Sequence, residues 1–197
     1  MDKLNGPKLK KSSFSRKEEI KRQATIMFKN RGYSGASVRD LAQQAGIEAP
    51  SIYSHFKSKE DILRKICLEM AQKFMKGLKK AEQHSCNKEK LKSAIASHIK
   101  IITKNLDASA VMWNEWKHLK GTGMVEFKEL KQIYEDRFHN ILEMGMESGD
   151  FHKNDPKILS NLIFSALNGI SFWYHGGSRS KIIDNMNIVL FNGIIKS

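Results

Sequence analysis

Apolar residues recur at helical spacing along almost the whole chain, and the alternation typical of strands is almost absent. One early segment carries Ile20, Ala24, Met27 and Phe28 at i, i+4, i+7 and i+8, which is one face of a helix. Only 3 of the 197 residues are proline, the residue that most often interrupts a helix. The pattern predicts an all-α protein of about nine helices without a sheet.

Three serine patterns near the N-terminus indicate where helices begin. In a capping box, a serine and an acidic residue three positions later satisfy free N–H groups of the first turn. The pairs are Ser15 with Glu18, Ser37 with Asp40, and Ser58 with Asp61. Gly32 and Gly46 follow the first two segments and suit the left-handed backbone that ends a helix, and Pro50 suits the first turn of a third. We therefore expect three short helices and then a long one over about residues 59–84.

The pattern divides the chain into an arm and two domains. Residues 1–14 are polar and basic and indicate a flexible arm, residues 15–60 hold the short helices, and residues 61–197 hold the longer ones. The last two helices are expected at about residues 156–174 and 180–196.

Basic charge is concentrated in the first third of the chain, whose formal net charge is +13. Residues 1–65 contain 15 Lys or Arg and 7 Asp or Glu, a net charge of +8, and the rest contributes +5. This distribution predicts a polyanionic partner, nucleic acid before an anionic membrane. A generally lysine-rich composition is the alternative explanation.

Several functional classes lack their sequence signatures. No apolar run approaches the roughly 20 residues that span a bilayer, and the N-terminus lacks the apolar centre of a signal peptide, so we expect a cytoplasmic protein with no membrane partner. Cys67 and Cys86 are too few and too isolated for a metal site or a disulfide framework. The chain has no HExxH pattern, phosphate loop or nucleophile elbow. We expect no enzyme activity, no catalytic or metal-binding residue and no cofactor.

A short helix, a glycine turn and a second short helix follow the plan of a helix-turn-helix. Ala42 is small where the helices must cross, Gly46 tolerates the turn, and Ile52 is apolar between the two helices. Leu41, Ile47 and Phe56 complete a small core. The basic surroundings favour a DNA-reading unit over a generic helical hairpin.

The stretch SVRDLAQQAGIEAPSIYSHFKSKEDIL resembles the DNA-binding domain of the tetracycline-repressor (TetR) family of transcription regulators. The close match covers roughly Phe14 to Leu63. The resemblance implies three N-terminal helices on a larger helical domain that binds an effector and forms a homodimer through its last two helices.

The same resemblance implies DNA contacts from a set of polar and small residues. These are Ser37, Arg39, Ala49, Pro50, Ser51, Tyr53, His55 and Lys59. Residues that open the recognition helix meet bases, and the last three residues of the set match contacts to the DNA backbone. Ala49 is poorly suited to reading bases, so we expect DNA recognition to depend more on Arg39, on DNA shape and on the basic arm.

The larger domain is expected to bind a small, largely apolar molecule. Candidate contacts are Trp113, Asn114, Tyr134, Arg137, Asn168, Phe172 and Trp173. The alternative for each aromatic residue is ordinary core packing. Asn168 lies in an apolar run, where a buried amide needs partners, so it either caps a bent helix near Gly169 or faces the ligand.

The segment NGISFWYHGGSRS resembles the same region of TetR-type regulators of lipid, steroid or aromatic-acid breakdown, several of which sense acyl-CoA thioesters. The resemblance implies a repressor that binds a palindromic operator and is released by a fatty acid or acyl-CoA. A ligand that moves the long connecting helix and binds two conformations unequally would supply the mechanism. The alternative function is an architectural protein that binds DNA with little sequence preference and has no effector.

Overall fold

The computed structural model describes residues 15–194, so the predicted arm at residues 1–14 lies outside the described part of the chain. The helices are α1 (Arg16–Arg31), α2 (Val38–Gln44), α3 (Ala49–Tyr53), α4 (Lys59–Ala81), α5 (Asn87–Lys104), α6 (Leu106–Glu115), α7 (Gly121–Glu147), α8 (Pro156–Trp173) and α9 (Arg179–Ile194), with a 3-10 helix, η1 (Trp116–His118), after α6. The prediction of an all-α protein with about nine helices is confirmed for this part.

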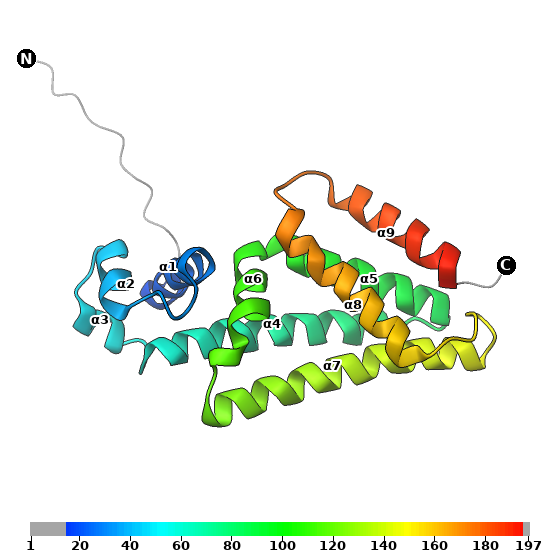
Figure 1. Ribbon diagram of the computed structural model, residues 1–197, viewed down its shortest axis with the longest axis horizontal. Coiled ribbons are helices and arrows are strands. Elements are labelled where there is room, and N and C mark those ends of the chain that lie inside the picture. The colour runs from blue at the N-terminus through cyan, green and yellow to red at the C-terminus, as the bar shows by residue number, and fades with distance from the viewer. Residues whose placement is uncertain (1–14, 195–197) are drawn as a thin grey trace, which may run out of the picture.

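Two parts follow one another along the long axis of the molecule (Figure 1). Helices α1–α3 form an N-terminal unit at one end, and α4 runs from it into a larger body built from α4 to α9. In the body α4 packs against α5, α6 and α7, while α8 and α9 lie on the outer side against α5. Between residues 15 and 194 no helix combines the length and the apolar character that crossing a membrane requires.

Local capping produces the predicted helix starts. The hydroxyl groups of Ser15, Ser37 and Ser58 accept hydrogen bonds from backbone N–H groups three residues on, at 3.3, 3.0 and 3.1 Å. Each bond satisfies an N–H group that has no partner inside the helix. Gly32 and Gly46 take φ of +70° and +64°, as expected for the ends of α1 and α2.

The end of helix α4 differs from its prediction, and the predicted end of the last helix lies outside the described residues. Helix α4 stops at Ala81 and not near residue 84, because the N–H groups of Gln83 and His84 bond three residues back and tighten the chain into turns. Helix α9 is described from Arg179 to Ile194, and residues 195–197 lie outside the described chain.

A continuous apolar core joins the N-terminal unit to the body. Ile20, Phe28 and Ile52 pack in the N-terminal unit, and Ile62 and Leu63 at the start of α4 belong to the same buried cluster. Cys67 is buried in this cluster, as its apolar helical stripe predicts. Because apolar packing is continuous, movements in the body can reach the N-terminal unit through packed side chains.

Candidate functional site

The surface of α2 and α3 presents polar side chains over a small buried core. Ile52 and Phe56 are each 1% exposed and hold α3 against α2, and the positive φ of Gly46 lets the chain turn between the two helices. Ser51 and Tyr53 point outward on the short α3, and the Tyr53 side chain is 55% exposed. The arrangement is that of a helix-turn-helix with an accessible second helix.

Most of the predicted DNA contacts lie on this surface. Arg39 and Pro50 are exposed, while Ala49 and His55 are half-buried. Ser37 is exposed, and its hydroxyl oxygen caps α2 while its O–H remains free to donate. These donors therefore lie on or beside α2 and α3, where phosphate and base edges of a duplex can meet the exposed ones.

Lys59 has a structural role that sequence reasoning did not foresee. Its ammonium group donates to the backbone oxygens of Tyr33 and Ala36 at 2.8 and 2.7 Å and lies 4.2 Å from the centre of the Tyr33 ring. An ammonium group has three donors, so one stays free for phosphate. Lys59 therefore connects α4 to the turn between α1 and α2 through hydrogen bonds. Its contact with phosphate stays a prediction.

Glu48 was not among the predicted contacts, yet it lies at the start of the recognition helix. It occupies the N-cap position of α3 without a hydrogen bond from its side chain to that helix, and it is exposed. A free carboxylate there can accept from the amino group of cytosine and repels phosphate. The signal was available, since the residue directly precedes the predicted base-reading positions.

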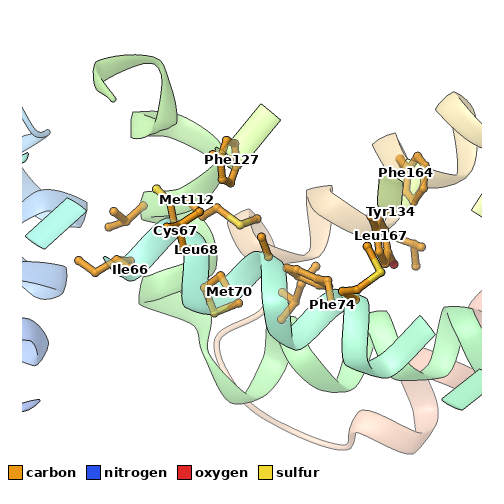
Figure 2. Close-up of a cluster of buried hydrophobic side chains, with 14 of the residues drawn as sticks. Ile66, Cys67, Leu68, Met70, Phe74, Met112, Phe127, Tyr134, Phe164 and Leu167 are labelled. Carbon is orange, nitrogen blue, oxygen red and sulfur yellow. The ribbon is translucent and has the colours of Figure 1, made fainter. Parts of the chain in front are cut away.

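An aromatic cluster surrounds a small apolar cavity in the body. Figure 2 shows Phe74 of α4 and Tyr134 of α7 pointing toward each other, with Phe164 of α8 beside Tyr134. The main lining side chains are Phe74, Trp113, Phe127, Leu130, Tyr134 and Phe164. The cavity measures about 30 Å³, which holds little more than water, whereas pockets for small molecules typically measure roughly 300–1,000 Å³. A larger ligand therefore requires the walls to move.

His98 of α5 joins two of the predicted effector residues and was itself missed. Its Nδ1 lies 2.8 Å from the Tyr134 hydroxyl, and its Nε2 lies 3.1 Å from the Asn168 side-chain oxygen. Because the amide oxygen can only accept, Nε2 carries the proton, and the Tyr134 hydroxyl donates to Nδ1. Burial lowers the pKa of His98 to about 4, against a smaller opposing effect of the Asn168 bond, so the ring is neutral at pH 7.

Asn168 has a partner that neither sequence alternative named. It neither ends α8, which continues to Trp173, nor lines the cavity directly. Its side-chain oxygen instead accepts from His98, which satisfies the amide group that stood out in an apolar run of the sequence. The hydrogen-bonded series Tyr134–His98–Asn168 therefore links the cavity wall on α7 to α8 through α5.

Besides Asn168, four of the seven predicted effector contacts lie away from the cavity. Asn114 is exposed on α6, and Phe172 and Trp173 are 65% and 55% exposed near the end of α8. Arg137 forms an ion pair with Glu82, its Nε donating to that carboxylate at 2.7 Å, and so ties α7 to the end of α4. The reason is that these residues lie on helix faces turned away from the cavity, which spacing within one helix does not reveal.

The outer faces of α8 and α9 expose large apolar side chains. They are Ile158, Leu162, Phe172 and Trp173 on α8, and Ile188 and Val189 on α9. Between the two helices runs an apolar groove of about 510 Å³ that Trp173, Met186 and Val189 help to line. Contiguous apolar surface of this kind typically marks an interaction site.

Across residues 15–194, no group of three or more His, Cys, Asp or Glu side chains is placed to hold a metal ion. Near the cavity, His98 is hydrogen-bonded to Tyr134 and Asn168, whereas the indole N–H of Trp113 has no hydrogen-bond partner in the described residues. The cavity lining therefore offers mainly apolar surface with a few hydrogen-bonding groups.

Two family models match the chain over both parts of the structure. Residues 20–66 match the model described as bacterial regulatory proteins, tetR family, and residues 85–193 match the tetracyclin repressor-like C-terminal domain. The chain belongs to the TetR family. It is a DNA-binding transcriptional regulator of this family and not an enzyme, as the sequence predicted.

Individual regulatory proteins are similar to this chain over most of their length. The fatty acid metabolism regulator protein of Bacillus subtilis is 25% identical over 162 residues, 81% of this chain and 84% of that protein. The HTH-type transcriptional repressor KstR2 of Mycolicibacterium smegmatis is 24% identical over 192 residues, 93% of this chain and 92% of that protein. The crystal structure of AibR in complex with isovaleryl coenzyme A and operator DNA has a TM-score of 0.81 at 21% identity, covering 91% of this chain and 100% of AibR, and shares the fold.

Proposed function

We propose that this TetR regulator is a dimeric repressor that binds a palindromic operator and is released by a fatty acid or an acyl-CoA. The observation that carries the proposal is the aromatic cavity of the body, whose mainly apolar wall holds a few polar groups. They are the Tyr134 hydroxyl, the indole N–H of Trp113 and the Lys131–Glu135 ion pair. Apolar walls with few polar anchors suit an acyl chain with a single polar end. The relative that regulates fatty acid metabolism and the fold shared with AibR, a protein bound to an acyl-CoA, support this class.

DNA binding is assigned to the exposed donors of α2 and α3. Arg39 can pair with guanine through two hydrogen bonds, and Ser51 at the start of α3 can meet either base of a pair. Tyr53 and His55, with the free donor of Lys59, suit phosphate oxygens, which fix the position of the protein without reading sequence. Ala49 and Pro50 pack against the groove and read little.

The dimer is assigned to the apolar faces of α8 and α9, with a second copy of the chain as the partner. Leu162 and Val189 are 63% and 71% exposed, and covering such surfaces would stabilise a complex. A twofold pair of α3 helices placed about one DNA turn apart then reads two half-sites. A near-palindromic operator follows from this symmetry.

We assign the release of the operator to an expansion of the cavity when the effector binds. Because the cavity of about 30 Å³ cannot hold an acyl chain, the effector binds a minor conformation in which the walls have separated. The effector shifts the population only by its unequal affinity for the two conformations, and a few kcal/mol suffice to change DNA occupancy substantially. Helix α4 and helix α6 both line the cavity and both contact the N-terminal unit.

Binding assays with an operator selected from a random-sequence library test the function. Palmitoyl-CoA should raise the dissociation constant for the operator and raise the thermal unfolding midpoint, whereas coenzyme A alone should do neither. Tyr134→Phe removes one hydroxyl from the cavity and should weaken palmitoyl-CoA binding by about tenfold with little change in operator affinity. The matched control is Tyr174→Phe, whose hydroxyl bonds to Gly177 away from the cavity.

Competition with random-sequence DNA at fixed salt separates the repressor from the architectural alternative. A repressor prefers its selected operator by a factor of about 10³ or more. Equal affinity for both DNAs, together with no response to palmitate or palmitoyl-CoA, would refute the proposed function.

A further inference from the structure

Tyr33, in the turn between α1 and α2, is held from three directions by side chains of other elements. We call Tyr33, Lys59, Glu115 and His118 the Tyr33 clasp. Glu115 is the last residue of α6, and His118 is the last residue of η1. Both residues belong to the body and lie more than 80 positions after Tyr33 in the sequence. Through Glu115 and His118, the clasp joins the DNA-reading unit to α6 and η1 of the body by contacts that do not involve α4.

Side chains of the body contact both the backbone and the ring of Tyr33. The Tyr33 N–H donates to the Glu115 carboxylate at 3.1 Å, and the Glu115 side chain is only 15% exposed. The His118 ring stacks on the Tyr33 ring with centroids 5.1 Å apart, and the Nε2 of His118 lies 3.4 Å from the same carboxylate. A hydrogen bond to a half-buried charge and an aromatic stack both fix orientation as well as distance.

The N-terminal unit and α4 complete the clasp from the other side. Phe28 of α1 meets the Tyr33 ring edge to face with centroids 5.3 Å apart. Lys59 of α4 donates to the Tyr33 backbone oxygen and lies over the ring. Tyr33 is thus the point at which α1, α4 and η1 converge, directly before α2 and the recognition helix.

Helix α6 connects the clasp to the cavity. Met112 and Trp113 of α6 line the cavity, and Glu115 lies only two residues after Trp113. The other end of α6 also contacts α1, through an ion pair of 2.6 Å between Asp107 and Lys29. Helix α6 has 10 residues, whereas α4, α7 and α8 have 23, 27 and 18, so α6 is the shortest of the helices that line the cavity.

We propose that Glu115 and His118 are positioning residues that carry effector binding from α6 to the DNA-reading unit through Tyr33. This inference rests on the proposed effector-responsive function. Displacement of Trp113 by an acyl chain moves Glu115 and His118, and the clasp rotates the α1–α2 turn and the recognition helix with them. The path runs beside the one through α4 and uses different residues.

Three double variants separate transmission from structural support. Glu115→Ala with His118→Ala removes the acceptor of the Tyr33 N–H group and the ring that stacks on Tyr33. Glu115→Gln with His118→Phe keeps an acceptor for the N–H and a ring for stacking, and is the conservative rescue. Glu129→Ala with His84→Ala is the matched control, because both side chains are exposed and neither makes a hydrogen bond or ion pair in the described chain.

Two readouts need no effector. Hydrogen exchange of the Tyr33 amide should be about tenfold faster in the alanine variant, because its acceptor is gone, and should stay as in the wild type in the control. Affinity for the selected operator should fall severalfold while affinity for random-sequence DNA stays constant, because only the specific complex needs fixed reading units. The rescue variant should restore both values.

The third readout is the response to palmitoyl-CoA. In the wild type the effector should weaken operator binding by a factor of about 5–150, the usual range of coupling between two sites. In the alanine variant that factor should fall to a few-fold, although palmitoyl-CoA binds with wild-type affinity, and the rescue variant should recover it. If palmitoyl-CoA releases the alanine variant from the operator as fully as it releases the wild type, the inference is overturned.

The outcome for the effector and the outcome for the clasp are distinguishable. If palmitoyl-CoA has no effect on the wild type, the proposed effector class fails, and the two readouts without effector decide the clasp. Unchanged Tyr33 exchange and unchanged operator affinity in the alanine variant would then overturn it.

Discussion

At the scale of single residues, the buried His98 is satisfied by partners from two other helices. His98 has hydrogen bonds from both ring nitrogens, to Tyr134 and to Asn168, inside an aromatic shell that includes Phe74 and Phe164. Such a network orients its members and excludes arrangements that would leave a donor unpaired. The residues that carry binding chemistry are therefore also residues that specify the packing of α5, α7 and α8.

The neutrality of His98 makes stability depend on pH. Its pKa in the folded protein is about 4, below the ordinary 6.5, so the unfolded chain binds a proton first as the pH falls. Stability linked to His98 is constant above pH 6.5 and is lost as the pH falls from 6.5 toward 4, by about 2 kcal/mol at pH 5. Urea unfolding at pH 7.5 and pH 5 should show that His98→Gln loses about 2 kcal/mol less than the wild type over this interval. His84→Gln, at an exposed site, should behave as the wild type, and an equal loss in all three proteins would contradict the assignment.

The exposed donors of the reading surface should divide into positioning and specifying groups. Tyr53→Phe should weaken binding to every DNA sequence by about tenfold, since its hydroxyl is assigned to phosphate. Arg39→Ala should weaken the preference for one base pair of the operator by about 1–3 kcal/mol. Affinity selection followed by sequencing measures both. Equal losses on all sequences for Arg39→Ala would refute the division.

At the scale of elements, helix ends are determined by few local hydrogen bonds. The Asp155 carboxylate accepts from the N–H groups of Lys157 and Ile158, both at 2.9 Å, and Pro156 starts α8 without needing an N–H partner. These contacts fix the start of a helix that carries both Asn168 and the exposed apolar stripe.

Removal of the α8 cap should be measurable in the folded protein. Asp155→Ala should lower the free energy of unfolding by about 1 kcal/mol, because two N–H groups lose their acceptor. Denaturant unfolding at constant protein concentration is the measurement, since a dimer would make stability depend on concentration. Lys153→Ala, exposed and two residues earlier, is the control. No difference between the two variants would show that water replaces the cap fully.

At the scale of the whole molecule, the reading unit and the outer helices lie at different places on one continuous core (Figure 1). Helices α4 and α6 lie between them and contact both the N-terminal unit and the cavity. A change in cavity volume can therefore alter the position of α3 relative to α8 and α9. In a dimer formed through α8 and α9, this change alters the spacing of the two recognition helices.

Disruption of the outer face should separate the copies without unfolding either. Val189→Asp places a charge at a site that is 71% exposed in a single chain, so the folded monomer tolerates it, but a dimer would bury it unpaired. Light scattering at micromolar concentration should report a monomer with unchanged helical circular dichroism, and operator binding should fall to the level of random DNA. Ile133→Asp on the exposed side of α7 should stay a dimer. A wild type that is itself monomeric would contradict the assignment.

The sequence by itself determined the helices, their caps and the helix-turn-helix. The helical periodicity of apolar residues, the capping serines and the turn glycines all act over a few neighbouring residues. The caps at Ser15, Ser37 and Ser58 therefore follow from local spacing alone. The match of α2 and α3 to a family motif has the same local basis.

Only the tertiary structure decided which polar side chains meet and which apolar faces stay open. His98 lies 36 positions from Tyr134 and 70 from Asn168, and no local rule relates them. Helix α8 carries apolar residues on both its buried and its exposed faces, so its pattern could not assign Phe172 and Trp173 to the surface. Local periodicity specifies the faces of a helix, but the packing of the other helices decides what each face contacts.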